Sequence, residues 1–135
     1  MTTRTGGCFC GAIRYEVEGD PMMQIACHCR ACQYAAGGSP TLAMLFPRSN
    51  LKVLKGQPRT WWAETDTGNK VGRSFCEACG THVFSEPTVS ELAVIKVGSL
   101  DDPSDFKPQL DIWMKTAQPW HLPHEGAMQF EGNPG

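Results

Sequence analysis

The sequence lacks the long apolar runs and the strong charge that mark several protein classes. No stretch of about 18 apolar residues occurs in the 135-residue chain, and residues 1–7 contain no apolar signal core. Twelve basic against 14 acidic residues give a net charge of −2, so the chain lacks the positive charge of a general nucleic-acid binder. We therefore expect a cytoplasmic protein with no membrane span and no nucleic-acid partner.

The chain is also too short for two hydrophobic cores. At 135 residues, a folded chain buries about two thirds of the surface that its unfolded form exposes, which is enough for one core. We expect a single domain over residues 1–135, with its core from about 3 to 134. Further stabilisation would have to come from cross-links or bound metal.

Segments that suit a long helix are scarce, because 14 Gly and 10 Pro interrupt the chain throughout. The clearest strand is 13–18, where apolar and charged residues alternate. Further strands are expected over 41–46, 51–54, 60–63, 81–84 and 92–97. Short helices are expected over 30–36 and from 102–103, and the tail 126–135 should end loosely on the surface. The pattern predicts a mainly β fold with short strands and little helix.

Cysteine is the unusually frequent residue. Seven occur, and an odd number without a secretory signal favours metal ligation over a disulfide framework. They form the groups Cys8-x-Cys10, Cys27-x-Cys29-x2-Cys32 and Cys76-x2-Cys79. In an extended Cys-x-Cys both thiolates lie on one side, and Cys-x2-Cys followed by Gly makes a tight turn that brings two sulfurs to one ion.

Seven thiols divide naturally into four and three. Zinc closes a structural site with four ligands, and it leaves one position open in a catalytic site with three protein ligands. We expect the closed site to be formed by Cys8, Cys10, Cys76 and Cys79. Cys27, Cys29 and Cys32 would then form an open site, whose fourth position is filled by water, a nearby side chain or a substrate. Chemistry is expected at this second site.

The sequence alone leaves open which metal the cysteines bind and whether a histidine is also a ligand. An iron–sulfur cluster is an alternative to zinc, but the spacing fits neither common ferredoxin pattern. His28 lies between two alternating cysteines and should point away from their metal, which makes it a structural residue or a support for the ligands. His82 follows Cys79 by three residues, and a place in the expected strand explains it as well as ligation does.

Several motifs together resemble one known family. They are GGCFCGAIRY at 6–15, CHCRAC at 27–32, FCEACGT at 75–81, GSLDDP at 98–103 and Pro-Trp at 119–120. In this order and spacing they resemble the glutathione-dependent formaldehyde-activating enzyme (GFA) family, which shares its domain with centromere protein V. The resemblance runs from about residue 3 to residue 134.

The resemblance implies a fold, a metal content and a reaction. The fold would be a β-rich domain of the Mss4-like class with two zinc ions. In the family, residues matching Cys8, Cys10, Cys76 and Cys79 hold the structural zinc, and those matching Cys27, Cys29 and Cys32 hold the catalytic zinc. The family's activity adds the thiol of glutathione, the co-substrate, to formaldehyde and gives S-hydroxymethylglutathione. Such an enzyme is formally a carbon–sulfur lyase, with a small-molecule thiol and an aldehyde as its partners.

Residues that would bind the substrate are less clearly marked. Glutathione has two carboxylates, which arginine can hold in a fork, and the candidates are Arg48, Arg59 and Arg73. Trp61, Trp62 and Trp120 are candidates to line a pocket, although we favour packing in the core for each. The basic excess over 48–73 is interpreted as solvated strand faces, with a landing surface for a small anionic substrate as the alternative.

Two other functions remain open from the sequence. The first is a non-catalytic zinc module for protein interaction, in which both ions are structural. The second is a zinc hydrolase, in which the open position carries hydroxide and attacks a carbonyl or an imine. A thiolate-rich ion is a weaker Lewis acid, which disfavours the hydrolase.

Overall fold

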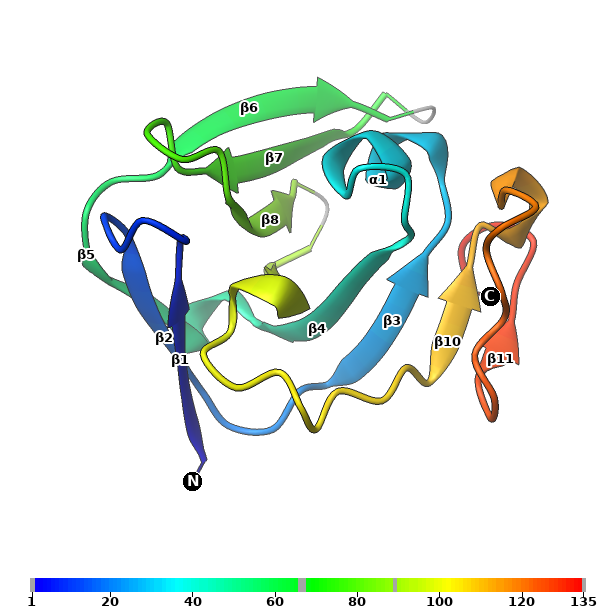
Figure 1. The fold of residues 1–135 in the computed structure, drawn as a ribbon, viewed down its shortest axis with the longest axis horizontal. Helices are drawn as coiled ribbons and strands as arrows, with labels where there is room; N and C mark the ends of the chain where they lie inside the picture. Colours follow the sequence, from blue (N-terminus) through cyan, green and yellow to red (C-terminus); the bar gives the residue numbers. More distant parts are fainter. Residues whose placement is uncertain (1, 66–67, 89, 135) are drawn as a thin grey trace.

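The computed structural model describes residues 2–65, 68–88 and 90–134, which form two sheets (Figure 1). The smaller sheet has the order β1 (Thr3–Gly7), β2 (Arg14–Glu18), β5 (Leu51–Lys55). The larger has the order β11 (Met128–Gln129), β10 (Leu110–Ile112), β3 (Met23–Cys27), β4 (Thr41–Pro47), β9 (Leu92–Lys96), β8 (His82–Pro87), β7 (Lys70–Phe75), β6 (Arg59–Glu64). The helices are α1 (Arg30–Ala35) and the single 3-10 turns η1 (Arg48–Asn50), η2 (Val97–Ser99) and η3 (Met114–Thr116). The expected mainly β fold is confirmed.

The main core contains the apolar faces of strands from both sheets. Along β2, Tyr15 and Val17 are fully buried while the alternating charged residues face outward, as the sequence pattern predicts. The Tyr15 ring meets Phe84 edge-on at 6.2 Å, and its hydroxyl lies 2.6 Å from the Ser99 hydroxyl. The other members include Met44, Phe46, Val83, Ala93 and Ile95.

All six expected strands occur, with shifts of a few residues at their ends, and five strands are additional. β10 and β11 have only three and two residues, too few for a periodic signal. β7 contains Gly72, and a glycine in a sequence indicates a turn more readily than a strand. In the structure a Cβ at Gly72 would lie 2.8 Å from the Trp62 ring, so the glycine permits a close approach within the sheet.

The expectation of a helix from 102–103 is wrong. The Asp102 carboxylate accepts hydrogen bonds from the backbone N–H and hydroxyl of Ser104, which makes a local turn. The turn is not continued, because the backbone N–H of Lys107 donates to the side chain of Gln24 at 3.0 Å. An Asp-Pro pair opens turns as readily as helices, and a hydrogen bond to a residue distant in sequence decides between them here.

The expectation of a loose tail is also wrong. β11 pairs in parallel with β10, and β10 pairs in parallel with β3, so the tail extends the edge of the large sheet (Figure 1). Beyond β11, the backbone carbonyl of Phe130 accepts a hydrogen bond from Met114, and the Asn133 side chain accepts one from the Trp113 indole at 2.8 Å. The tail thus accepts hydrogen bonds from N–H groups for which the sequence alone indicates no partner.

Candidate metal centre

Cys8 and Cys10 lie in the turn between β1 and β2. The expectation of an extended Cys-x-Cys segment is therefore wrong: a backbone hydrogen bond from Gly11 to Cys8 closes a turn instead. Cys76 and Cys79 lie in the turn between β7 and β8, where Gly80 donates to the carbonyl of Cys76 at 2.8 Å. Gly80 has φ +79°, a left-handed conformation that glycine adopts without a Cβ clash.

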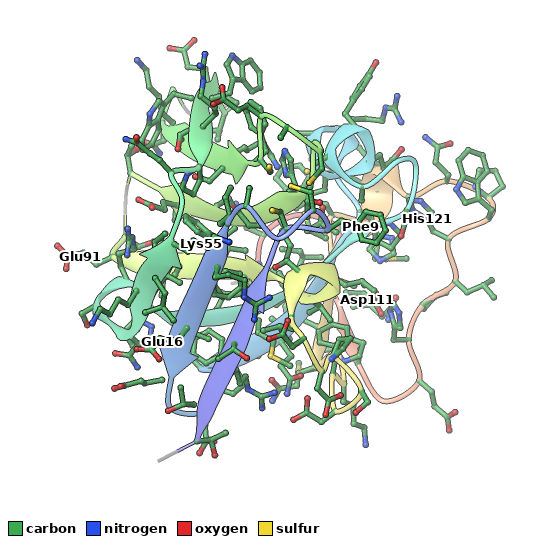
Figure 2. All side chains as sticks on the ribbon, turned by 60° about the vertical axis from the view of Figure 1, so that its left-hand side comes forward. Phe9, Glu16, Lys55, Glu91, Asp111 and His121 are labelled. Carbon is green, nitrogen blue, oxygen red and sulfur yellow. The ribbon has the colours of Figure 1, made fainter. Side chains whose placement is uncertain are left out.

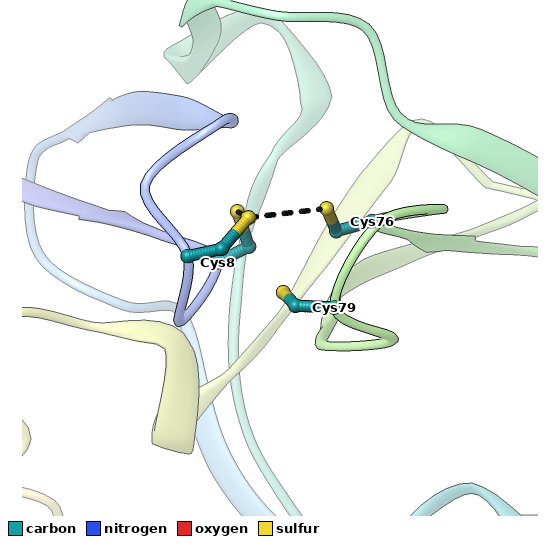
Figure 3. Close-up of side chains that lie close together, drawn as sticks. Cys8, Cys76 and Cys79 are labelled. Atoms are coloured by element: carbon teal, nitrogen blue, oxygen red, sulfur yellow. Dashed lines mark hydrogen bonds between the residues drawn. The ribbon is translucent and has the colours of Figure 1, made fainter.

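The four sulfur atoms of these turns converge although the turns are far apart in sequence (Figure 3). The Sγ atoms of Cys8 and Cys10 are 3.6 Å apart, and those of Cys10 and Cys76 are 3.8 Å apart. A tetrahedral zinc ion with Zn–S bonds of about 2.3 Å requires sulfurs about 3.8 Å apart. The donor set, Cys8, Cys10, Cys76 and Cys79, thus fits a four-coordinate zinc.

Neighbouring donors favour the thiolate form of Cys8 and Cys79 at this four-cysteine site. The buried Sγ of Cys8 accepts a hydrogen bond from the backbone N–H of Ile13 at 3.2 Å. The Thr81 hydroxyl lies 3.2 Å from the Sγ of Cys79 and is the main cause that lowers the pKa of Cys79 to about 5. A thiolate is the form that ligates a metal.

Cys27, Cys29 and Cys32 come from one continuous segment. Cys27 ends β3, Cys29 is the residue before α1, and Cys32 lies in the first turn of that helix. Their sulfurs lie within 4.8 Å of one another, and the Cys29 Sγ accepts the backbone N–H of Cys32 at 3.4 Å. Hydrogen bonds from Cys27 and then Cys29 lower the pKa of Cys32. This three-cysteine site provides three of the ligands that a metal requires.

His28, between two of these cysteines, is completely buried and fully hydrogen-bonded. Its backbone N–H donates to the carbonyl of Ile112 at 2.9 Å, and its carbonyl accepts from the Gln33 side chain at 2.8 Å. Its ring nitrogens face His121 at 3.1 Å and Asp111 at 2.8 Å. The ring therefore belongs to a network apart from the three sulfurs and anchors the backbone that carries them, as expected for a supporting residue.

The tautomer of His121 in this buried network follows from its partners. His121 Nε2 lies 2.7 Å from the carbonyl oxygen of Gly38, which only accepts, so Nε2 carries the proton. The Nδ1 of His121 accepts the backbone N–H of Gln118 at 3.3 Å and lies 3.1 Å from Nδ1 of His28. His121 and Asp111 lie on the same side of the molecule in Figure 2, and both come from the part of the chain that follows β9.

Asp111 is the centre of the network, and it was not found from the sequence. Its Oδ1 lies 2.8 Å from His28 and 2.9 Å from Nδ1 of His124, and its Oδ2 accepts from the His124 backbone and from Gln129. Burial by itself would raise the pKa of Asp111, but the hydrogen bonds from His28 and His124 outweigh it and lower the pKa. His28, Asp111 and His124 lie within 4.8 Å, as metal ligands would, but hydrogen bonds already engage both carboxylate oxygens.

The candidates for substrate binding are dispersed. Arg48 pairs with Glu86 and Arg59 with Glu77, so both have partners elsewhere, while Arg73 lies in β7. His82 stacks on Phe75 and belongs to no ligand group among the described residues.

The tryptophans are not in the core. Trp61, Trp62 and Trp120 are 64%, 49% and 66% exposed, so the favoured core interpretation is wrong. Trp120 lines a groove of about 250 Å³ with Pro40 and Leu42. Leu42 pairs with Ala26, so this groove lies on the opposite face of the sheet from Cys27.

One comparison with known proteins gives the family, and another gives the fold. The family described as glutathione-dependent formaldehyde-activating enzyme matches residues 3–116 of this chain. A crystal structure of a protein from Rhodobacter sphaeroides matches with a TM-score of 0.58 and 24% identity, over 72% of this chain and 87% of that one. At that identity the likeness concerns the fold alone. No helix in the described ranges is long and apolar enough to cross a membrane.

Proposed function

Since the chain belongs to the glutathione-dependent formaldehyde-activating enzyme family, we propose that it is a zinc-dependent carbon–sulfur lyase. It would join glutathione, or a similar small thiol, to formaldehyde or another small aldehyde, and would also catalyse the reverse reaction. The observation that carries the proposal is the convergence of Cys27, Cys29 and Cys32 with no fourth described cysteine or histidine in their ligand group. The seven free thiols suit a reducing cytoplasm.

The two cysteine sites would have different roles. The four-cysteine site offers a complete ligand set and would hold a structural zinc. The three-cysteine site would hold a second zinc, which when bound deprotonates a coordinated thiol and fixes its position. Cys27, Cys29 and Cys32 supply the protein ligands there. His28, held by Asp111 and His121, keeps the segment that carries them in place.

The reaction itself needs few atoms to move. The thiolate sulfur forms a bond to the aldehyde carbon, the carbonyl π electrons pass to the oxygen, and that oxygen takes a proton to become a hydroxyl group. In the reverse direction the hydroxyl loses its proton and the carbon–sulfur bond breaks. An enzyme would accelerate this reaction largely by positioning the thiol and the aldehyde, because a bimolecular step then becomes effectively unimolecular.

The proposal is tested by zinc content, thiol binding and exchange rate together. Native mass spectrometry should show two zinc ions per chain and a glutathione adduct. NMR exchange spectroscopy should show faster interchange between hydrated formaldehyde and S-hydroxymethylglutathione. Cys29→Ala should lose one zinc, the adduct and the acceleration, while Met22→Ala, an exposed change just before β3, should keep all three. An inactive wild type across a panel of thiols and aldehydes would contradict the proposal.

One observation favours a second function, a zinc module for protein interaction. Trp61 and Trp62 are exposed on β6, one of the two edge strands of the large sheet. Exposed aromatic residues are enriched where proteins bind one another. If wild type carries two zinc ions but neither binds thiol nor accelerates exchange, and Trp61→Ser abolishes capture of a partner protein, this alternative replaces the lyase.

A further inference from the structure

Lys96 lies on the same face of the large sheet as the three-cysteine site. It is the last residue of β9 and pairs with Ala43 of β4, which in turn pairs with Ile25 of β3. Directly paired residues share a face of a sheet, as do residues two apart on one strand. Lys96, Ala43, Ile25 and Cys27 therefore point to one side, with Lys96 two strands away from the cysteine strand.

The side chain of Lys96 is mostly buried and has no ion-pair partner among the described residues. The residue is only 9% exposed, and no hydrogen bond or ion pair joins its side chain to another of the described residues. By contrast, Arg4 and Arg14 pair with aspartates. Burial weakens the hydration of an ammonium, and negative charge nearby offsets that loss.

The negative charges that act on Lys96 are those of the cysteines in the three-cysteine site when they are thiolates. Burial lowers the pKa of Lys96, and the charge of Cys32 is the largest effect that opposes it. Reciprocally, the charge of Lys96 is among the causes that lower the pKa of Cys32. Arg73 reinforces the positive potential, because it pairs with Ser85, which pairs with Val94, two residues before Lys96 on the same face.

The charge balance explains what Lys96 would do. Three thiolates and a Zn²⁺ ion carry a net charge of about −1, and a fourth thiolate changes it to about −2. A cation on the same face offsets the added repulsion, whereas it gains nothing from a neutral fourth ligand. We propose that Lys96 is a specificity-determining residue that makes the three-cysteine site prefer an anionic thiolate to a neutral ligand. This inference rests on the proposed function, since it requires metal at that site.

Ligand affinities test the inference without recourse to catalysis. Protein loaded with Co²⁺ in place of zinc is titrated with 2-mercaptoethanol, whose only charge is its thiolate, and separately with imidazole, while the visible absorption of the metal is followed. Lys96→Met should raise the Kd of the thiol by about tenfold to thirtyfold, as expected for one charge pair several Å apart at intermediate dielectric. It should leave the Kd of imidazole within about twofold.

Two further variants control the experiment. Lys96→Arg keeps the charge and should bind the thiol nearly as wild type does, and Lys55→Met removes an exposed lysine of the other sheet and should change neither Kd. Lys96→Gln, checked for metal content and Tm, replaces Lys96→Met if the latter does not fold. Equal effects on thiol and imidazole, or none on either, overturn the role of Lys96 alone. A wild type that binds neither ligand overturns this role and the proposed function together.

Discussion

The two cysteine sites are assembled in opposite ways. The four-cysteine site joins Cys10 to Cys76, which are 66 residues apart in sequence, and it lies between two turns. The three-cysteine site comes from a six-residue segment whose members would be near one another in any fold. Its fixed geometry is supplied from elsewhere, through His28 and the buried Asp111. A ligand set that cross-links the chain should stabilise the fold, whereas a local ligand set depends on the fold for its shape.

The largest expected effect is the loss of the cross-link. Cys76→Ala removes a buried thiol that we propose as a zinc ligand, and zinc binding energy is folding energy in small metallodomains. We expect the variant to lose one zinc and about 5 kcal/mol or more of its free energy of unfolding, which is most of the stability of a typical domain. Calorimetry with metal analysis measures both. A variant with the Tm of wild type would show that this site does not cross-link the fold.

The next effect tests how far Asp111 supports the segment that carries the three-cysteine site. Asp111→Asn keeps the shape of the side chain but removes a buried charge that two imidazoles face. We expect a loss of about 2–3 kcal/mol, as for hydrogen bonds to a buried charged group. Urea unfolding measures it, with Gln129→Ala, which removes one donor at the same carboxylate, as a milder control. A loss below about 1 kcal/mol would mean that the three-cysteine segment holds its shape unaided.

A smaller effect on stability is expected at the three-cysteine site itself. Cys29→Ala removes a partly exposed thiol that we propose as a zinc ligand, and it breaks the hydrogen bond that the Sγ of Cys29 accepts from the backbone N–H of Cys32. The free energy of unfolding should fall by about 1–2 kcal/mol, while one zinc and the proposed activity disappear. Urea unfolding beside Cys76→Ala under the same conditions measures the difference. An equally large destabilisation of the two variants would erase the distinction between the two sites.

The smallest effect concerns the surface of the four-cysteine site. Arg59 and Glu77 form an ion pair at 3.2 Å next to the turn of Cys76, and both side chains are mostly exposed. Such pairs contribute about 0–1 kcal/mol. Arg59→Met should therefore leave the zinc content unchanged and shift the Tm by no more than a few degrees. A clear loss of zinc would show that the turn needs this pair as well as its sulfurs.

The sequence predicts those features that neighbouring residues determine. β2 follows from alternation at Tyr15 and Val17, and α1 from the short run ended by glycines. The grouping of sulfurs follows from spacing and from the number of ligands that zinc takes. That any of these sulfurs hold zinc stays a prediction, since it depends on an ion as well as on the chain.

The features that the sequence misses depend on pairing between distant segments. Asp111, His121 and His124 have no recognisable spacing relative to His28, because parallel pairing of β10 with β3 brings them together. β11 cannot be predicted from the sequence either, since its two residues form a strand only by pairing with β10. The exposure of the tryptophans on β6 has a similar cause: β6 is an edge strand, and an edge exists only in the assembled sheet.

The parallel pairing of β11 with β10 also bears on the order in which the molecule matures. A chain made from its N-terminus has all four ligands of the first site once Cys79 has left the ribosome, whereas Asp111 and Gln129 emerge later. The four-cysteine site can therefore form while the ring of His28 still lacks Asp111. Cys27, Cys29 and Cys32 emerge earlier still, so synthesis supplies the thiols of the three-cysteine site first and the support of their segment last.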